Sequence, residues 1–394
     1  MINEKMRELG AKRSVIRELF EYGKKRKQEI GEEKVFDFSL GNPSVPAPTE
    51  VNESLIKMLT EENSVTLHGY TSAQGDLSVR QAIADYINSN YDESITPDCL
   101  YMSVGAAAAL TSSLTAIVSP GEEVIVPSPY FPEYKVFIER CGGVIIEVPC
   151  DENLMLNVSA IEEAINERTA AIIVNSPNNP TGVVYSEENI KELTSALRRC
   201  EEKYSHPIYL IADEPYRELA YDGVNVPYMT KYYDDTIVCY SFSKSLSIPG
   251  ERIGYAMVCP RCYDFKSVYE AVCGAGRALG YVCAPSLLQK LIPYCLGKTA
   301  DISVYDTNRR LLIEKLNEYG FEIIKPQGAF YLFIKSPSGD AYEFSERAKQ
   351  HNILIVPSDD FGLGGYARLA YCVTTEQIER ALPAFNALAK SYKE

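Results

Sequence analysis

Short apolar runs alternate with longer amphipathic segments from about residue 76 of the chain onward. The segment at 76–90 carries its apolar residues at helical spacing, and the run EEVIVPS at 122–128 predicts a buried strand. Five further apolar runs continue the series: GGVIIEVPC, AAIIVNSP, PIYLIADEP, DTIVCYSFSK and GYAMVCP. Runs of this kind, separated by helical stretches such as 186–204, are typical of parallel strands with helices on both faces. The predicted fold class is therefore α/β, with a mostly parallel sheet covered by helices.

The pattern changes after about residue 286, where a long helical segment leads into the runs FEIIKPQGAFYLFIK, ILIVPSDDFG and ARLAYCV. This part predicts a smaller α+β domain. A chain of 394 residues is too long for one ordinary core, so we expect two domains. We place a large domain at 46–286 and a small domain at 1–45 plus 287–394. The first 45 residues are too few for a separate domain and are expected to pack against the C-terminal part.

Polar side chains stand at the downstream ends of three apolar runs. Asn175 follows AAIIV, Asp213 follows IYLIA, and Lys244 follows TIVCYSFS. Open α/β sheets bind ligands at the carboxyl ends of their strands. We therefore expect an amide, a carboxylate and an amine to converge on one crevice.

Charge and hydropathy exclude several classes of protein. The net charge of -15 argues against nucleic-acid binding, which requires basic patches that displace counterions from phosphates. No stretch approaches the roughly 20 apolar residues that span a bilayer. The first 20 residues are charged throughout, unlike a signal peptide. We expect a cytoplasmic protein with neither a nucleic-acid nor a membrane partner.

Histidine and metal chemistry are also disfavoured. The three histidines, His68, His206 and His351, are far apart in sequence, which removes the commonest general base and metal ligand. The eleven cysteines are scattered singly and are expected to be reduced and mostly buried. Cys259 and Cys262 form a CPRC, but no second pair of ligands completes a zinc site. We expect no metal.

Lys244 by itself has an ordinary explanation, because strand ends often carry solvated lysines. Its surroundings, YSFSKSLSIPGERIGY, place two serines before the lysine and Gly-Glu-Arg-Ile-Gly after it. This segment resembles the cofactor-lysine segment of the fold-type I aminotransferases. Six further segments resemble that family in the same order: SLGNPS, GYTSAQGDLSVRQAIA, SVGAAAALTSSLTAIVSPGEEVIVPSPYFPEY, NSPNNPTGVVY, IADEPYREL and GYARLAYCV. The chain is identified by this resemblance as a member of the class I/II, aspartate-aminotransferase-like enzymes.

The resemblance implies pyridoxal 5′-phosphate (PLP) as cofactor, carried by Lys244 as a Schiff base. PLP accepts electrons from the α-carbon of an amino acid, which requires a protonated ring nitrogen and a carboxylate beside it. The family places Asp213 in that role. It also implies that Asn179 and Tyr216 bind the phenolic oxygen of the ring and that Tyr130 stacks on the ring. The alternatives are a plain turn at Asn179 and core packing of Tyr130.

The phosphate of the cofactor needs backbone donors and cations. A helix that begins after a glycine would supply exposed amides and a favourable dipole, although GAAAAL can also be a good helix former and nothing more. The residues that the resemblance assigns to the phosphate are Gly105, Ala106, Ala107, Ser241, Ser243 and Arg252. Tyr70 corresponds to a family tyrosine that reaches the phosphate of the neighbouring subunit. The resemblance therefore implies a homodimer with shared sites.

Arg368 matches the family arginine that binds the α-carboxylate of the substrate, a pairing suited to the bidentate geometry of a guanidinium. Gly41 and Asn42 are expected at the substrate mouth, and Asn179 is expected to contact the substrate as well as the cofactor. Arg277 lies near the region where aspartate-specific relatives carry a second arginine. A structural role for Arg277 is an equal alternative.

The expected function is PLP-dependent transamination between an L-amino acid and a 2-oxo acid, in a ping-pong sequence. Lys244 would serve first as covalent anchor and then as general acid-base. One alternative is a PLP-dependent lyase or decarboxylase on the same fold. A more distant alternative is the non-catalytic PLP-binding part of a transcription regulator. The absence of a basic helix-turn-helix pattern and the negative charge argue against the regulator.

Overall fold

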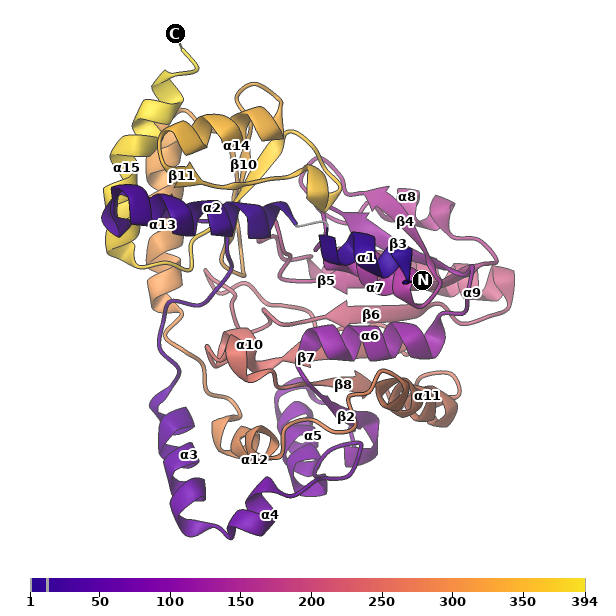
Figure 1. The fold of residues 1–394 in the computed structure, drawn as a ribbon. Coiled ribbons are helices and arrows are strands. Elements are labelled where there is room, and N and C mark those ends of the chain that lie inside the picture. The colour runs from indigo at the N-terminus through magenta and orange to yellow at the C-terminus, as the bar shows by residue number, and fades with distance from the viewer. Residues whose placement is uncertain (1, 12–13, 394) are drawn as a thin grey trace.

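The computed structural model describes residues 2–11 and 14–393 (Figure 1). Its centre is a seven-stranded sheet in the order β2-β8-β7-β6-β5-β3-β4. Within this sheet β8 alone runs antiparallel to its neighbours, which confirms the predicted, mostly parallel sheet. Its strands are β2 (Leu100–Ser103), β3 (Glu123–Ser128), β4 (Val144–Pro149), β5 (Thr169–Asn175), β6 (Tyr209–Asp213), β7 (Thr236–Ser241) and β8 (Gly254–Val258).

Helices cover both faces of this sheet. On one face lie α6 (Ala106–Ile117), α7 (Glu133–Arg140) and α11 (Phe265–Ala278), and on the other α5 (Leu77–Tyr91), α8 (Val158–Ala164) and α9 (Glu187–Tyr204). Successive side chains of a strand point to opposite faces. In β5, Ala171 and Ile173 therefore join the core of the first face, and Ile172 and Val174 that of the second. Burial on both faces explains why the strand is an unbroken apolar run.

A smaller sheet of four antiparallel strands has the order β12-β13-β10-β9, and β1 pairs in parallel with β11 nearby. Its strands and helices are β1 (Phe36–Asp37), β9 (Ile323–Ile324), β10 (Tyr331–Lys335), β11 (Ile353–Leu354), β12 (Val356–Pro357), β13 (Tyr366–Ala370), α13 (Ser303–Tyr319), α14 (Ala341–Gln350) and α15 (Thr375–Lys390). Apart from β12, whose Val356 packs with Leu19 of the N-terminal segment, they contribute to one apolar core. The α+β texture predicted for the C-terminal part is confirmed.

The N-terminal segment packs in two places. Helix α2 (Val15–Ile30) contacts β12 of the small sheet, and its N-cap Ser14 accepts a hydrogen bond from the backbone N–H of Arg17. Helix α1 (Glu4–Ala11) lies beside α7 in Figure 1, where Lys5 pairs with Glu139 at 3.5 Å. Helix α1 thus lies against the large-sheet part and α2 against the small sheet.

The remaining α-helices of the described residues are α3 (Thr49–Glu61), α4 (Ser64–His68), α10 (Phe242–Ser245) and α12 (Ser286–Cys295). Helix α12 contacts α3, α4 and α5, on the side of the large sheet. The boundary predicted at residue 286 falls at the first residue of this helix, and the chain continues to α13 through residues 296–302. The division into two domains stays a prediction.

Among residues 2–11 and 14–393, no helix is long and apolar enough to cross a membrane. The same residues contain no group of three or more His, Cys, Asp or Glu side chains arranged to hold a metal ion. Cys259 and Cys262 of the CPRC segment are buried free thiols.

Candidate active site

One cavity of ≈ 380 Å³ lies where three central strands end. Asn175 ends β5, Asp213 ends β6 and Ser241 ends β7, and all three line the cavity. Tyr331 of β10 and Arg368 of β13 also line it. The cavity is therefore shared by the carboxyl edge of the large sheet and the small sheet.

Lys244 lies in α10, which begins directly after β7. Its Nζ donates a hydrogen bond to the carbonyl oxygen of Gly41 at 2.8 Å. Burial lowers the pKa of Lys244 to about 8; the nearby Cys372 works in the opposite direction. The positive charges of Arg252 and Arg368 lower the pKa of Lys244 further. A substantial share of this amine is thus uncharged at mildly alkaline pH, as a nucleophile or proton acceptor must be.

The carboxylate of Asp213 is buried and only partly hydrogen-bonded. The hydroxyl of Tyr134 donates to its Oδ2, and Asn175 Nδ2 donates to the backbone oxygen of Asp213 at 2.8 Å. Oδ1 of Asp213 has no hydrogen-bond partner among the described residues. Burial raises the pKa of Asp213 to about 7, and the hydrogen bond from Tyr134 opposes this shift. A buried, free acceptor of this kind favours a ligand that brings a proton or a positive charge.

The start of α6 forms a polar corner of the cavity. Gly105 precedes the helix with a φ of 87° and provides no side-chain cap, and Ala106 and Ala107 line the cavity. The first amides of a helix have no partner within it, so they and the helix dipole favour an anion. A Cβ at position 105 would lie 2.6 Å from Arg252 Nη2. Glycine therefore allows the guanidinium to approach the helix start.

Two serine hydroxyls complete this corner. The Oγ atoms of Ser241 and Ser243 are hydrogen-bonded at 2.6 Å, and Arg252 Nη1 donates to Ser243 Oγ at 3.4 Å. Ser241, Ser243 and Arg252 all line the cavity. Helix amides, two hydroxyls and a guanidinium are together a donor set suited to a phosphate group.

Arg368 is almost fully buried, with 2% of its surface exposed. Its Nη1 donates to Asn179 Oδ1 at 3.0 Å and its Nη2 donates to the carbonyl oxygen of Ser39 at 2.7 Å. Nε has no hydrogen-bond partner in the described part of the chain. The guanidinium carbon lies 4.6 Å from the ring centre of Tyr331 and 5.1 Å from that of Phe361. The two aromatic rings thus hold the Arg368 guanidinium in place, and its Nε–H is left as a donor for a carboxylate.

Asn179 and Tyr216 reach the cavity from the turns that follow β5 and β6. The backbone N–H of Asn179 donates to Asn175 Oδ1 at 2.7 Å, which fixes the turn. The hydroxyls of Tyr216 and Tyr331 are 3.0 Å apart. Burial raises the pKa of Tyr216, so its hydroxyl stays protonated and can donate.

The family model for class I and II aminotransferases matches residues 33–385 of the chain, and so spans the cavity and both sheets. The chain belongs to this family. It is therefore an aminotransferase, and the family uses PLP. It is 32% identical over 365 residues to the putative aminotransferase YugH of Bacillus subtilis (strain 168), covering 89% of this chain and 90% of that protein. It is 30% identical over 366 residues to the aspartate/prephenate aminotransferase of Thermus thermophilus, covering 88% of each.

Solved structures of aminotransferases share the fold. A crystal structure of an aminotransferase from Eubacterium rectale superposes with a TM-score of 0.98 at 52% identity and covers 100% of both chains. The aspartate aminotransferase of Thermus thermophilus with maleate superposes with a TM-score of 0.85 at 27% identity, covering 97% of this chain and 98% of that one. The predicted family, fold and enzyme class are confirmed.

The structure places Phe131, the neighbour of the predicted Tyr130, at the aminotransferase cavity, and the stacking role of Tyr130 stays a prediction. Phe131 lines the cavity, whereas Tyr130 does not. The hydroxyl of Tyr130 donates to Glu147 Oε1 at 3.0 Å, and its ring touches the position where Gly362 would carry a Cβ. Tyr130 therefore packs between β4 and the segment after β12, while the next residue, Phe131, faces the cavity.

Gly105, which directly precedes the lining residue Ala106, does not itself line the cavity, and three other predicted residues lie outside the cavity of their own chain. Tyr70 has 93% of its surface exposed, in the segment between α4 and α5. Asn42 is exposed, although the neighbouring Gly41 lines the cavity. Arg277 is exposed near the end of α11. The structure does not bring these three together with Lys244.

Besides Phe131, two further aromatic residues of the site were missed in the sequence. Tyr134 lies on α7, 79 positions before Asp213, and no local pattern links the two. Tyr331 belongs to β10, where its ring lies against Arg368 and its hydroxyl meets Tyr216. The polar tip of a tyrosine inside the apolar run GAFYLFIK was a signal that could have found it.

Proposed function

We propose that this aminotransferase moves an amino group between an L-amino acid and a 2-oxo acid, in two half-reactions, with PLP bound covalently to Lys244. One observation carries the proposal: a partly buried lysine with a lowered pKa, a buried carboxylate with a free oxygen and a helix start with a guanidinium line the same cavity. These groups fit the three chemically distinct parts of PLP: its aldehyde carbon, its ring nitrogen and its phosphate. The cavity between the sheets is then the catalytic centre.

Each part of the cofactor has a set of residues to hold it. Asp213 Oδ1 would accept a hydrogen bond from the protonated ring nitrogen, and Phe131 would cover one face of the ring. Asn179 and Tyr216 would donate to the phenolic oxygen. The phosphate would bind the group formed by Gly105, Ala106, Ala107, Ser241, Ser243 and Arg252. When bound, PLP supplies an electron sink for the α-carbon of the amino acid.

Lys244 has two tasks under this proposal. Its amine would hold the cofactor, and when the amine is free the same Nζ would accept the proton from the substrate α-carbon. Both tasks require an uncharged amine. The pKa of about 8 that burial gives Lys244 makes this form accessible without a separate base. Histidine is not needed, in agreement with the scarcity of that residue in the chain.

Arg368 would bind the α-carboxylate of the substrate. The guanidinium already spends two donors on Asn179 and Ser39, and its Nε is free of partners in the described residues. A bidentate pair with a carboxylate would fix the α-carbon in front of Lys244. Gly41 lines the same cavity. The neighbouring Asn42 is exposed and would contact the substrate only at the mouth of this cavity.

We further propose that two copies form a homodimer in which Tyr70 reaches the phosphate site of the partner. Tyr70 is exposed, and several large apolar side chains on the neighbouring elements are exposed with it. They are Ile56, Leu59, Val65, Leu77 and Val282, each more than half exposed. Apolar patches of this kind favour a protein partner. Arg277 lies outside the cavity of its own chain, so a role in substrate binding would also require a second subunit.

The test is a screen of amino donors and keto acceptors with purified enzyme, followed by the absorbance of the bound cofactor and by product analysis. Formation of a keto acid and of pyridoxamine phosphate supports transamination. Release of ammonia or carbon dioxide without pyridoxamine phosphate would identify a lyase or decarboxylase. The variant Lys244→Ala should lose turnover and covalent cofactor, and normal turnover in this variant would refute the proposal.

A further inference from the structure

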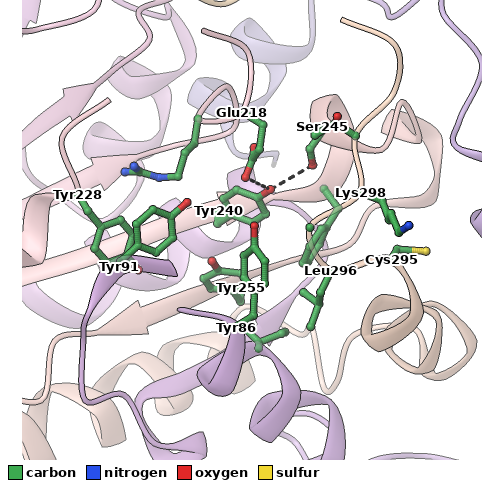
Figure 2. Close-up of a pocket in the computed structure, with 15 residues that line it drawn as sticks. Tyr86, Tyr91, Glu218, Tyr228, Tyr240, Ser245, Tyr255, Cys295, Leu296 and Lys298 are labelled. Carbon is green, nitrogen blue, oxygen red and sulfur yellow. Dashed lines mark hydrogen bonds between the residues drawn. The ribbon is translucent and has the colours of Figure 1, made fainter. Parts of the chain in front are cut away.

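A second, smaller cavity of ≈ 60 Å³, which we call the rear chamber, borders the other side of α10 (Figure 2). Ser243 and Lys244 line the catalytic cavity, whereas Phe242 and Ser245 line the rear chamber. The single turn of α10 is therefore the wall between the two spaces. Residues 296–299, where the chain leaves α12 for α13, line the rear chamber as well.

A chain of hydrogen bonds runs through the rear chamber to the residue next to Lys244. The Tyr240 hydroxyl donates to Glu218 Oε1 at 2.8 Å, and it lies 3.1 Å from Ser245 Oγ (Figure 2). A tyrosine hydroxyl has one proton, so while it donates to Glu218 it must accept from Ser245. The carboxylate of Glu218 thus determines which group donates and which accepts in both hydrogen bonds. It also determines the direction in which the Ser245 hydroxyl points its proton.

The surroundings hold this chain in place. The Tyr240 ring lies 5.0 Å from the Phe242 ring and 5.1 Å from the Tyr255 ring. The backbone oxygen of Ser245 accepts a hydrogen bond from Ala300 N at 2.7 Å, which ties α10 to the segment before α13. Beside the chain, Arg217 forms a buried ion pair with Glu214. Because Arg217 is engaged there, Glu218 is available as the carboxylate acceptor for Tyr240.

We propose that Glu218 is a positioning residue for Lys244, acting through Tyr240 and Ser245. Helix α10 has four residues, and one isolated helical turn has too few internal hydrogen bonds to hold its own geometry. Its orientation must therefore come from bonds to other elements. The chain from Glu218 pins the rear of the turn, and Lys244 on the front then points into the catalytic cavity. The inference rests on the proposed function, in which Lys244 is the reacting amine.

A second tyrosine of the rear chamber, Tyr228, provides a control for substitution of Tyr240. Tyr228 lines this chamber, and its hydroxyl is buried and has no hydrogen-bond partner among residues 2–11 and 14–393. Tyr228→Phe and Tyr240→Phe remove the same atom from the same chamber, but only the second breaks the chain. At Glu218, Gln keeps a carbonyl acceptor for Tyr240, whereas Leu removes it. Each variant that breaks the hydrogen-bond chain thus has a control variant that leaves this chain intact.

The experiment measures Lys244 itself in the cofactor-free protein, by the pH dependence of its reaction with an amine-specific reagent, with the modified residue identified by mass spectrometry. Cys372, Arg252 and Arg368 are the titratable or charged groups that face Lys244 and are unchanged in all variants. In Tyr240→Phe and Glu218→Leu the loosened turn admits water to the amine. The midpoint of the profile should then move upward by about 0.5 to 1 in pH, and turnover of the loaded enzyme should fall at least about tenfold.

Tyr228→Phe and Glu218→Gln should keep the midpoint of the unaltered protein. The inference is overturned if Tyr240→Phe and Tyr228→Phe give the same midpoint and the same turnover. Should Glu218→Leu fail to fold, the two tyrosine variants decide the matter alone. Failure of the proposed function would be recognised separately, because Lys244→Ala would then retain turnover whatever the rear-chamber variants do.

Discussion

The hydroxyl of Tyr134 donates a hydrogen bond to Oδ2 of Asp213, and Oδ1 of the same carboxylate is left without a partner among the described residues. One oxygen is thus used to orient the group and the other is kept for a ligand. Burial raises the pKa of Asp213 and this hydrogen bond lowers it, so Tyr134 helps to keep the carboxylate ionised.

Tyr134→Phe should therefore weaken the pairing of Asp213 with the ring nitrogen. A hydrogen bond to a charged group contributes about 1.5 to 3 kcal/mol, so we expect kcat to fall about 10- to 100-fold. Steady-state kinetics with a fixed donor and acceptor pair measure this. Tyr233→Phe is the control, because the buried Tyr233 hydroxyl donates to the Ile208 carbonyl at 2.8 Å, away from the cavity. Equal losses in the two variants would contradict the assigned role of Tyr134.

Gly105→Ala should weaken cofactor binding. The added Cβ would lie 2.6 Å from Arg252 Nη2 and would push the guanidinium away from the start of α6. We expect at least about a tenfold rise in the dissociation constant for PLP, measured by equilibrium titration. Gly121→Ala is the matched control, since Gly121 has a φ of 89° against 87° for Gly105 but nothing within 4 Å of its Cβ. Both variants should lose about 1 kcal/mol of folding stability from backbone strain, and only the first should lose affinity.

Phe131→Leu should mainly lower the affinity for PLP, whereas Tyr130→Leu should mainly lower the melting temperature. Loss of the aromatic face at Phe131 should weaken PLP binding about 2- to 10-fold, the range for one ring-to-ring contact, with little effect on the melting temperature. Tyr130→Leu removes the hydrogen bond to Glu147 from a buried position, so it should lower the melting temperature more than the affinity. If Tyr130→Leu changed affinity alone, the ring would stack on Tyr130 after all.

The pKa of Lys244 makes a prediction about stability in the absence of cofactor. The unfolded chain keeps this pKa near 10.5 and the folded chain lowers it to about 8, so between these values the unfolded state binds more protons. The Lys244 contribution to the free energy of unfolding therefore rises with pH across this window. Below pH 8 the folded protein carries a desolvated ammonium.

Lys244→Met removes this charge and keeps a side chain of similar length. The variant should be more stable than the unaltered protein at pH 7, and its advantage should shrink by about 1 to 3 kcal/mol as the pH is raised towards 10. Urea denaturation of both cofactor-free proteins at a series of pH values measures the difference between their free energies of unfolding. The contributions of the other titrating groups are the same in both proteins and cancel in this difference. An advantage independent of pH would show that Lys244 is well solvated in the folded state.

The large sheet and the position of the cavity at the carboxyl ends of its strands could be predicted because both depend on the local pattern of apolar and polar residues. Apolar runs such as AAIIV and IYLIA mark strands buried on two faces, and Asn175 and Asp213 follow them directly. The end of a strand is a local property, and the convergence of strand ends follows from the parallel arrangement. Family resemblance then supplied the roles of these residues, which remain to be tested.

What could not be predicted depends on contacts between distant elements. The side to which Tyr130 and Phe131 point is decided by the path of the chain after β3, and motif spacing does not record it. The bond from Tyr134 to Asp213 joins residues 79 positions apart. The rear chamber brings Glu218, Tyr240 and Ser245 together from a turn, a strand and a helix, and no one of these residues stands out in the sequence.

The catalytic cavity is built by two sheets that carry different duties. Lys244 and Asp213 extend from the large sheet, whereas Arg368 and Tyr331 extend from the small one. Under the proposed function, the reacting groups therefore come from one sheet and the groups that recognise the substrate come from the other. Substitutions among the small-sheet residues around Arg368 are then expected to change which amino acid is accepted while the reacting groups keep their geometry, so the scaffold has a route to new substrates without loss of its reaction.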